Sequence, residues 1–259
     1  MKSTNCVRVF NPKYTFKSFV VGNQNSFACA TAKAVAEAPG KSYNPVLFHG
    51  GVGLGKTHLL HAIGQHVAST KPGARVAYLS AEQFTNGYID AVQNNQIDVF
   101  RNKYREIDVL LVDDIQFFAG RPRILEAFFH TLILLHEAHT QIVMAGNCSS
   151  SEIEELERNL ISRFEWRLVV DLPPPDFDTR LAILDQKTRV MGVQLSPHIQ
   201  HFLANRICTD IRRLEGAMIL AVSYASLTGK KLTTKLVEGL TNAAYKASNE
   251  TSCAANNNS

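Results

Sequence analysis

The chain has 259 residues, 45% of them hydrophobic, enough for one large domain or for a domain followed by a smaller one. Its formal net charge of +4 is mildly basic, which permits contact with nucleic acid without requiring it. No apolar run approaches the roughly 20 residues that a membrane-spanning helix needs, and the N-terminus lacks the apolar stretch of a signal peptide.

The cysteines argue against a disulfide framework or a structural zinc site. There are five, at Cys6, Cys29, Cys148, Cys208 and Cys253, and they are odd in number, widely spaced and never arranged as CxxC. We therefore expect a reducing, cytoplasmic setting for the protein.

Along the first two thirds of the chain, short apolar runs alternate with helix-favouring segments. Short apolar runs followed by turns are typical of buried parallel strands. Strands are predicted at 46–49, 75–80, 109–112, 141–145 and 167–170. Helical segments are predicted at 23–38, 58–69, 81–104, 125–139 and 152–164. This order indicates an α/β domain, a parallel sheet covered by helices on both faces.

The pattern changes at residues 172–176 (LPPPD), beyond which no strand is predicted. Four helical segments are expected instead, at 177–191, 197–206, 210–226 and 234–246. The last residues are polar and low in complexity, which is typical of disorder. The predicted organisation is a flexible arm (1–10), an α/β domain (11–172), a small all-helical lid (173–247) and a disordered tail (248–259).

Residues 50–57 (GGVGLGKT) match the phosphate-binding loop GxxxxGK[ST]. Glycines let the backbone turn tightly and aim several N–H groups inward, and the following helix adds its positive N-terminal end. The lysine can reach the β- and γ-phosphates, and the threonine hydroxyl can bind Mg²⁺. A glycine-rich turn without a ligand is the alternative, but the strand before and the helix after favour a nucleotide site. The expected nucleotide contacts are Gly51, Gly53, Gly55, Lys56, Thr57 and His58.

The strand predicted at 109–112 delivers Asp113 and Asp114 to its carboxyl end. This is a Walker B arrangement, in which Asp113 would hold Mg²⁺ and Asp114 would polarise the attacking water. Carboxylates suit the task because a hard cation prefers oxygen ligands. Alone the pattern is weak, since strands often end in Asp at turns. Paired with the upstream loop it predicts an ATPase site on one sheet.

Several longer stretches take the chain beyond a generic phosphate-binding protein. They are 11–16 (NPKYTF), 100–105 (FRNKYR), 111–117 (LVDDIQF), 162–166 (SRFEW) and 210–217 (DIRRLEGA). On these stretches the sequence resembles the DnaA family of bacterial replication initiators, from about Asn11 to about Ala247. The resemblance implies a P-loop AAA+ fold with a five-stranded parallel sheet and a helical lid, binding ATP or ADP with Mg²⁺. It also implies slow, switch-like hydrolysis of ATP.

The same resemblance assigns three further roles around the nucleotide. Asn147 stands at the family's sensor 1 position, where Asp is usual, and Asn still suits a hydrogen bond to phosphate or water. Arg163 matches the arginine finger that reaches a neighbouring subunit's ATP. Arg212 matches the sensor 2 arginine, which approaches the γ-phosphate from the lid. A planar, permanently charged guanidinium suits both roles, although an ordinary surface arginine is the alternative for each.

Three residues are expected to contact DNA. In the family, single-stranded origin DNA runs along the inside of the oligomer, and Ile89 matches an apolar contact there. Arg123 matches a basic contact, and Arg121 lies close by. Arginine on phosphate with an apolar side chain on sugar or base is a sound strand-binding pair. One apolar and two basic residues are also easy to find by chance, so this prediction is the least specific.

Two functions remain open at this point. In the first, the ATP form assembles head to tail on single-stranded origin DNA to initiate chromosomal replication, and hydrolysis resets it. In the second, the chain is a truncated adaptor that regulates full-length DnaA without opening the origin itself, since the resemblance leaves no room for the family's N-terminal and helix-turn-helix domains. A helicase loader, the third reading, is disfavoured by the stretches around Trp166 and Arg212.

Overall fold

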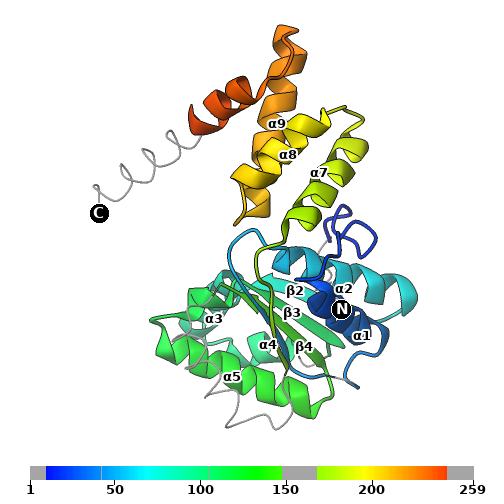
Figure 1. Cartoon of the computed structure of the whole chain (residues 1–259). Helices are drawn as coiled ribbons and strands as arrows, with labels where there is room; N and C mark the ends of the chain where they lie inside the picture. Colours follow the sequence, from blue (N-terminus) through cyan, green and yellow to red (C-terminus); the bar gives the residue numbers. More distant parts are fainter. Residues whose placement is uncertain (1–9, 42, 105, 148–167, 244–259) are drawn as a thin grey trace. The chain divides into compact units, whose positions relative to one another are not determined.

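The computed structural model describes residues 10–41, 43–104, 106–147 and 168–243. The chain divides into two compact units between Pro173 and Pro174. The first unit is built around a sheet, and the second consists of helices (Figure 1).

The first unit contains a five-stranded parallel sheet in the order β2-β3-β4-β1-β5. Helices α1 and α2 cover one face, and α3, α4 and α5 cover the other (Figure 1). The predicted fold class is therefore confirmed. The strands are β1 (Val46–His49), β2 (Val76–Ser80), β3 (Val109–Asp113), β4 (Gln141–Gly146) and β5 (Leu168–Asp171). The helices are α1 (Ser26–Glu37), α2 (Lys56–Thr70), α3 (Ala81–Gln93), α4 (Ile97–Asn102), the 3-10 helix η1 (Ile115–Phe118) and α5 (Pro122–Glu137).

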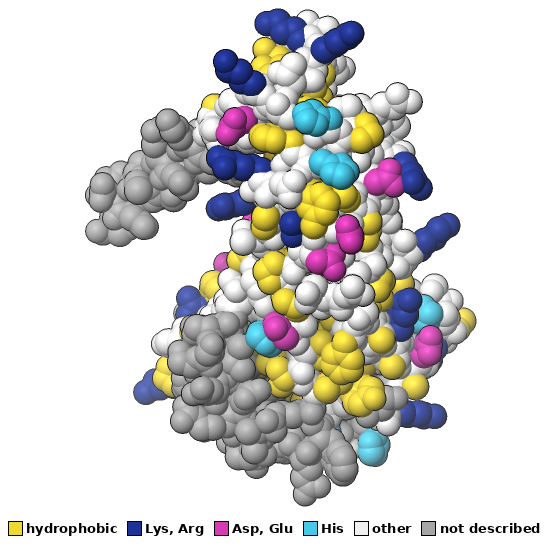
Figure 2. Space-filling model, in the orientation of Figure 1, with side chains coloured by type: hydrophobic (Ala, Val, Ile, Leu, Met, Phe, Trp, Pro, Cys, Tyr) yellow, Lys and Arg dark blue, Asp and Glu magenta, His cyan; other side chains and the backbone are white. Residues whose placement is uncertain are grey.

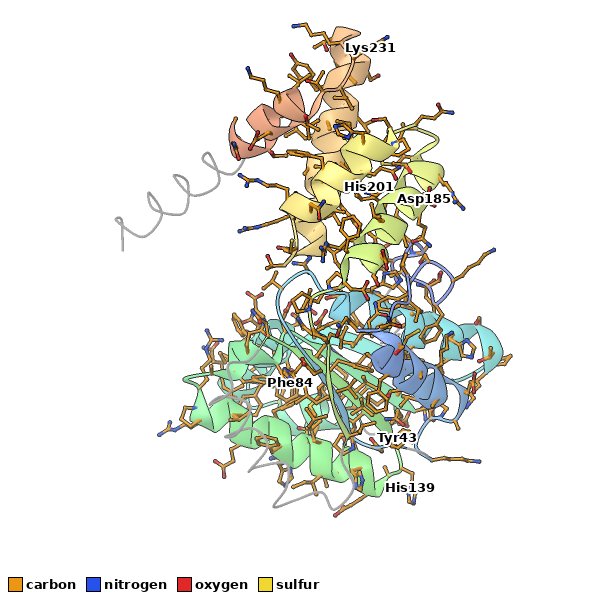
Figure 3. All side chains as sticks on the ribbon, viewed as in Figure 1. Tyr43, Phe84, His139, Asp185, His201 and Lys231 are labelled. Atoms are coloured by element: carbon orange, nitrogen blue, oxygen red, sulfur yellow. The ribbon has the colours of Figure 1, made fainter. Side chains whose placement is uncertain are left out.

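The sheet separates two hydrophobic cores, because successive side chains of a strand point to opposite faces. In β3, Leu111 packs toward α1 and α2, whereas Leu110 and Val112 pack toward α3, α4 and α5. On the second face Phe84 points from α3 into a cluster of aromatic rings (Figure 3). Burial on both faces explains why the strands read as continuous apolar runs rather than alternating ones.

The strand register brings the candidate site to one edge of the sheet. Phe48 of β1 is level with Ala145 of β4, and Val112 of β3 is level with Met144. Asp113, the last residue of β3, therefore lies at the same level of the sheet as the end of β1, where the glycine-rich loop begins. Since β4 lies between β1 and β3, and neighbouring strands lie about 4.8 Å apart, the two chain segments emerge about 10 Å from each other.

One predicted element is wrong in its extent. The single helical stretch expected over 81–104 is divided into α3 and α4, with Asn95 between them at φ 54°. Asparagine tolerates this left-handed conformation, which an α-helix cannot contain. Helix α5 also begins earlier than predicted, because Pro122 occupies its first turn, where the missing N–H costs nothing. The predicted helix at 152–164 lies outside the described residues.

The second unit packs its helices around a core of its own. Asp176 caps α7 by accepting the backbone N–H of Thr179, and this hydrogen bonding lowers the pKa of Asp176. Lys and Arg side chains gather near the C-terminal end of α9, where Lys231 lies (Figures 2 and 3). The helices are α7 (Phe177–Met191), α8 (Pro197–Arg206), α9 (Ile211–Thr228) and a further helical segment over 234–243.

Among the described helices, none combines the length and the apolar character required to cross a lipid bilayer.

Candidate nucleotide site

The loop after β1 has a backbone that only glycine can supply at two positions. Gly50 has φ 150°, and a Cβ there would lie 2.4 Å from the carbonyl oxygen of Leu172. Gly55, the N-cap of α2, has φ 101°, and a Cβ there would lie 2.9 Å from the ring of Phe19. The loop therefore folds back tightly before α2, and the N-terminal end of this helix adjoins it.

Lys56, the first residue of α2, lies under this loop. Its side chain is only 7% exposed, and Nζ donates hydrogen bonds of 2.7 Å to the carbonyl oxygens of Gly50 and Gly51. The ammonium group is thus held at the loop itself, next to the N-terminal end of α2. The ammonium group, together with the helix dipole, makes this corner of the unit suited to an anion.

Both carboxylate oxygens of Asp113 are oriented by neighbouring groups. Asp113 is 3% exposed, and Oδ2 accepts a hydrogen bond of 3.0 Å from the hydroxyl of Tyr78. Oδ1 accepts the backbone N–H of Asp114 at 3.0 Å. Tyr78 was not anticipated from the sequence. Tyr78 lies on β2 opposite Leu111 of β3. Leu111 is two residues before Asp113, so the two share a face of the sheet, and only the register between β2 and β3 shows that Tyr78 lies near Asp113.

Asp114 and Asn147 are connected through a residue that the sequence analysis missed. Asp114 has a left-handed backbone (φ 57°) and is the N-cap of η1. The side-chain amide of Gln116 donates through Nε2 to Asp114 Oδ1 at 3.0 Å. Its Oε1 accepts the backbone N–H of Asn147 at 2.9 Å. The two predicted catalytic positions, at the ends of β3 and β4, are therefore brought together.

The residues just before α1 lie along α2 and engage its histidines. The backbone N–H of Asn11 donates to Nδ1 of His61 at 3.4 Å, and the ring of His61 lies 4.4 Å from that of Tyr78. Burial lowers the pKa of His61, while the charge of Asp113 acts in the opposite direction. His58, a predicted nucleotide contact, has Nε2 2.9 Å from the carbonyl oxygen of Thr15, and its contact with nucleotide remains a prediction.

The last residue of the predicted arm belongs to this packing. Phe10 is partly buried in the core that α1 and α2 share, and its ring lies edge-on to His61. A Cβ on Gly64 would meet the ring of Phe10 at 2.3 Å, so the glycine allows this close approach.

The candidate DNA contacts lie on the face covered by α3, η1 and α5. Ile89 of α3 is 39% exposed, and Arg121 and Arg123 are exposed at the start of α5. The guanidinium carbon of Arg121 lies 4.0 Å from the ring centroid of Phe117, which is a cation–π contact. Phe117, which the sequence did not single out as a contact of Arg121, connects this arginine to η1.

The structure does not test the roles predicted for two arginines. Arg163 lies outside the described residues. Arg212 is exposed in the first turn of α9, in the second unit, where its backbone N–H donates to Oδ1 of the N-cap Asp210. The proposed roles of both arginines remain predictions.

The donor set at the sheet edge fits Mg²⁺ and a polyphosphate. Mg²⁺ takes oxygen ligands, keeps several of its waters and typically uses one or two carboxylates together with substrate phosphates. Thr57 supplies a hydroxyl in the first turn of α2, and Asp113 supplies a carboxylate whose two oxygens are already oriented. Lys56 and the loop N–H groups would hold the phosphates.

A hollow of about 400 Å³ lies elsewhere, beside the N-terminal ends of the strands. Its walls include Lys71, Asp108 and His139, from the end of α2, the start of β3 and the end of α5. None of the predicted site residues lines it, so it is separate from the candidate nucleotide site.

Comparisons with known proteins find similar sequences and structures. The sequence model of the bacterial DnaA ATPase domain matches residues 10–171. The crystal structure of domain III of the Thermotoga maritima replication initiation protein DnaA is 39% identical, with a TM-score of 0.83. The match covers 90% of this chain and 97% of that one.

Two longer structures are also similar. DnaA of Aquifex aeolicus bound to AMPPCP is 34% identical with a TM-score of 0.75, over 86% of this chain and 67% of that one. A replication initiator DnaA bound to AMPPCP and single-stranded DNA is 33% identical with a TM-score of 0.76, over 92% and 70%. The Aeropyrum pernix ORC2 protein, 15% identical with a TM-score of 0.63, shares the fold.

Proposed function

This chain belongs to the family of bacterial DnaA ATPase domains, and we propose that it binds ATP with Mg²⁺ at residues 50–57 and 113–114 and hydrolyses it slowly, as a switch. The observation that carries the proposal is the common edge of the sheet. There the loop with Lys56 and the oriented carboxylate of Asp113 emerge about 10 Å apart, a distance that a metal-bound triphosphate can span.

The side chains have distinct tasks in hydrolysis. Bound Mg²⁺ would neutralise charge on the phosphate oxygens. Asp114 orients and polarises the attacking water, and Asn147 hydrogen-bonds that water or a γ-phosphate oxygen. Lys56 stabilises the charge that develops on the phosphates. Arg163 of a neighbouring subunit and Arg212 of the lid would complete the site, so hydrolysis depends on assembly.

Single-stranded origin DNA is the proposed partner of the face that carries Ile89, Arg121 and Arg123. A structural relative bound to AMPPCP and single-stranded DNA supports this assignment. The exposed guanidinium groups of the two arginines would bind phosphates, and the apolar side chain would contact sugar or base. The ATP form would assemble head to tail along the strand, because heterologous contacts that do not close give helical assemblies.

Gel filtration with single-stranded DNA tests the proposal. With ATP the protein should elute as large species, and with ADP as a monomer or small oligomer. Arg163→Ala should keep ATP affinity while preventing both assembly and hydrolysis. A protein that binds ATP yet stays small in both nucleotides would contradict assembly and favour an adaptor of full-length DnaA. Unchanged assembly and hydrolysis in Arg163→Ala would contradict the role of Arg163 as an arginine finger.

A further inference from the structure

The 3-10 helix η1 lies between the candidate nucleotide site and the candidate DNA-binding face. It follows Asp113 and Asp114 directly, and Arg121 comes three residues after its end. The backbone N–H of Phe117 donates to the carbonyl oxygen of Asp114 at 3.0 Å, and that of Arg121 donates to Phe118 at 3.1 Å. Eight consecutive residues, from Asp114 to Arg121, therefore join a predicted catalytic carboxylate to a predicted strand-binding arginine.

On the nucleotide side, Gln116 uses both ends of its amide. Nε2 donates to the carboxylate of Asp114, and Oε1 accepts the N–H of Asn147. An amide suits both partners, because one requires a donor and the other an acceptor. If Asp114 turns its carboxylate toward water at a bound γ-phosphate, the Nε2 bond is lost and the amide is free to leave Asn147.

On the DNA side, Phe117 holds the guanidinium group of Arg121. The 4.0 Å stack fixes the plane of a long, exposed side chain, and so reduces the entropy that Arg121 would lose on binding phosphate. Beside Phe117, Ile115 and Phe118 are 3% and 2% exposed and anchor η1 in the aromatic core. Gln116 and Phe117 are adjacent residues between these two anchors, so a change in the backbone at Gln116 also acts on Phe117.

We propose that η1 couples the nucleotide site to strand binding, with Gln116 and Phe117 as its two positioning residues. The proposal rests on the proposed function, since it requires ATP at the sheet edge and single-stranded DNA at Arg121. Coupling is reciprocal: if ATP raises the affinity for the strand by some factor, the strand raises the affinity for ATP by the same factor. The bistable contact is the hydrogen bond between Asp114 and Gln116.

The experiment measures strand affinity by fluorescence anisotropy with a labelled oligothymidylate short enough for one protomer, which separates coupling from assembly. The wild type is expected to bind about fivefold or more tightly with ATP than with ADP. Gln116→Glu keeps the acceptor for Asn147, loses the donor and adds a charge beside Asp114. Its ATP affinity should stay within about threefold of wild type, while the ATP-to-ADP ratio of strand affinities falls to about 1.

Phe117→Leu tests the DNA-binding side of η1. It keeps an apolar side chain against the core but removes the aromatic face, so strand affinity should fall about three- to tenfold with ATP, with ADP and without nucleotide. Phe117→Tyr should restore it. The matched controls are Gln200→Ala, which loses a side-chain to backbone hydrogen bond in α8, and Phe27→Leu, at an exposed ring of α1. Melting temperatures verify folding, and Gln116→Ala replaces Gln116→Glu if the latter does not fold.

The outcomes separate the two proposals. If the wild type fails to bind ATP or the oligonucleotide, the proposed function is contradicted and the coupling with it. The coupling through η1 is overturned, while the proposed function stands, if the wild type binds both but shows no nucleotide dependence. It is also overturned if Gln116→Glu retains the wild-type ratio of strand affinities, or if Phe117→Leu retains the wild-type strand affinity.

Discussion

The two faces of the sheet are built differently. The face under α1 and α2 is lined by small and aliphatic side chains, among them Ala32, Ala36 and Leu60. The face under α3, α4 and α5 is dominated by aromatic rings, including Phe84 and Phe128. Small residues let helices approach the sheet closely, whereas interlocking rings fill a wider layer.

The contrast extends to the candidate sites. The nucleotide site adjoining α2 is shaped by the backbone: glycines with positive φ, loop carbonyl groups that hold Lys56, and helix N–H groups. The candidate DNA-binding face is shaped by side chains, such as the ring of Phe117 under Arg121. We therefore expect substitutions on the aromatic face to act through packing and those at the loop to act on ligand binding with little effect on folding.

The largest expected effect is on the aromatic face. Phe128 is completely buried and lies 4.5 Å from the ring of Phe118 and 5.1 Å from that of Phe84. Phe128→Ala should lower the free energy of unfolding by about 3–5 kcal/mol, because it removes apolar contact and leaves a cavity. Urea denaturation measures this. Phe27→Ala, at a ring that is 62% exposed, is the control and should change stability by less than about 0.5 kcal/mol. Equal decreases in the free energy of unfolding in both variants would mean that the aromatic cluster does not contribute more to stability than an exposed ring.

The next effect is at the loop. Lys56→Ala removes the one side-chain charge held by the loop carbonyl groups, so affinity for ATP should fall at least about 100-fold, as expected for loss of charge-assisted hydrogen bonds. Calorimetric titration with ATP measures it. Lys33→Ala, on the exposed side of α1, should leave ATP affinity unchanged. Unchanged binding in Lys56→Ala would defeat the assignment of the site.

The strands and the phosphate-binding loop were predictable from the sequence, for a physical reason. Strands buried on both faces must be apolar throughout, so β1 and β3 are visible as short runs of Val, Leu and Phe. A phosphate loop needs glycines and a lysine at a set spacing, and residues 50–57 show that spacing. Local constraints of this kind leave a direct signature in the chain.

Contacts set by register or by one unusual residue could not be predicted in this way. Tyr78 reaches Asp113 because β2 and β3 pair in a particular register, and Gln116 reaches Asn147 because β3 and β4 are neighbours. The break between α3 and α4 depends on the left-handed backbone of Asn95, and asparagine also occurs inside helices. Each of these needs three-dimensional information that a single sequence does not contain.

A smaller effect is expected on strand binding. Arg123→Ala should weaken binding of single-stranded DNA about three- to tenfold, and should reduce the slope of log affinity against log salt concentration by about 1, as for loss of one phosphate contact. Anisotropy measurements at several salt concentrations give both values. Arg75→Ala removes an exposed arginine that pairs with Glu106 through a 2.6 Å contact and should change neither. A weakened affinity with an unchanged slope would argue that Arg123 acts through structure rather than through phosphate.

The smallest effect concerns the packing of the chain before α1 against α2. Burial holds the pKa of His61 below its ordinary value of 6.5, so the folded protein favours the neutral ring. As the pH falls below 6.5, the unfolded chain takes up a proton first, and the free energy of unfolding decreases until the folded-state pKa is passed. His61→Asn should therefore reduce the acid-induced drop in melting temperature by about 1 to 3 °C relative to wild type. His130→Asn, on the exposed side of α5, is the matched variant. If the melting temperatures of both variants fall with acid as that of the wild type does, the ring of His61 beside Tyr78 is not the group that titrates. The acid sensitivity of this part of the unit then comes from other side chains.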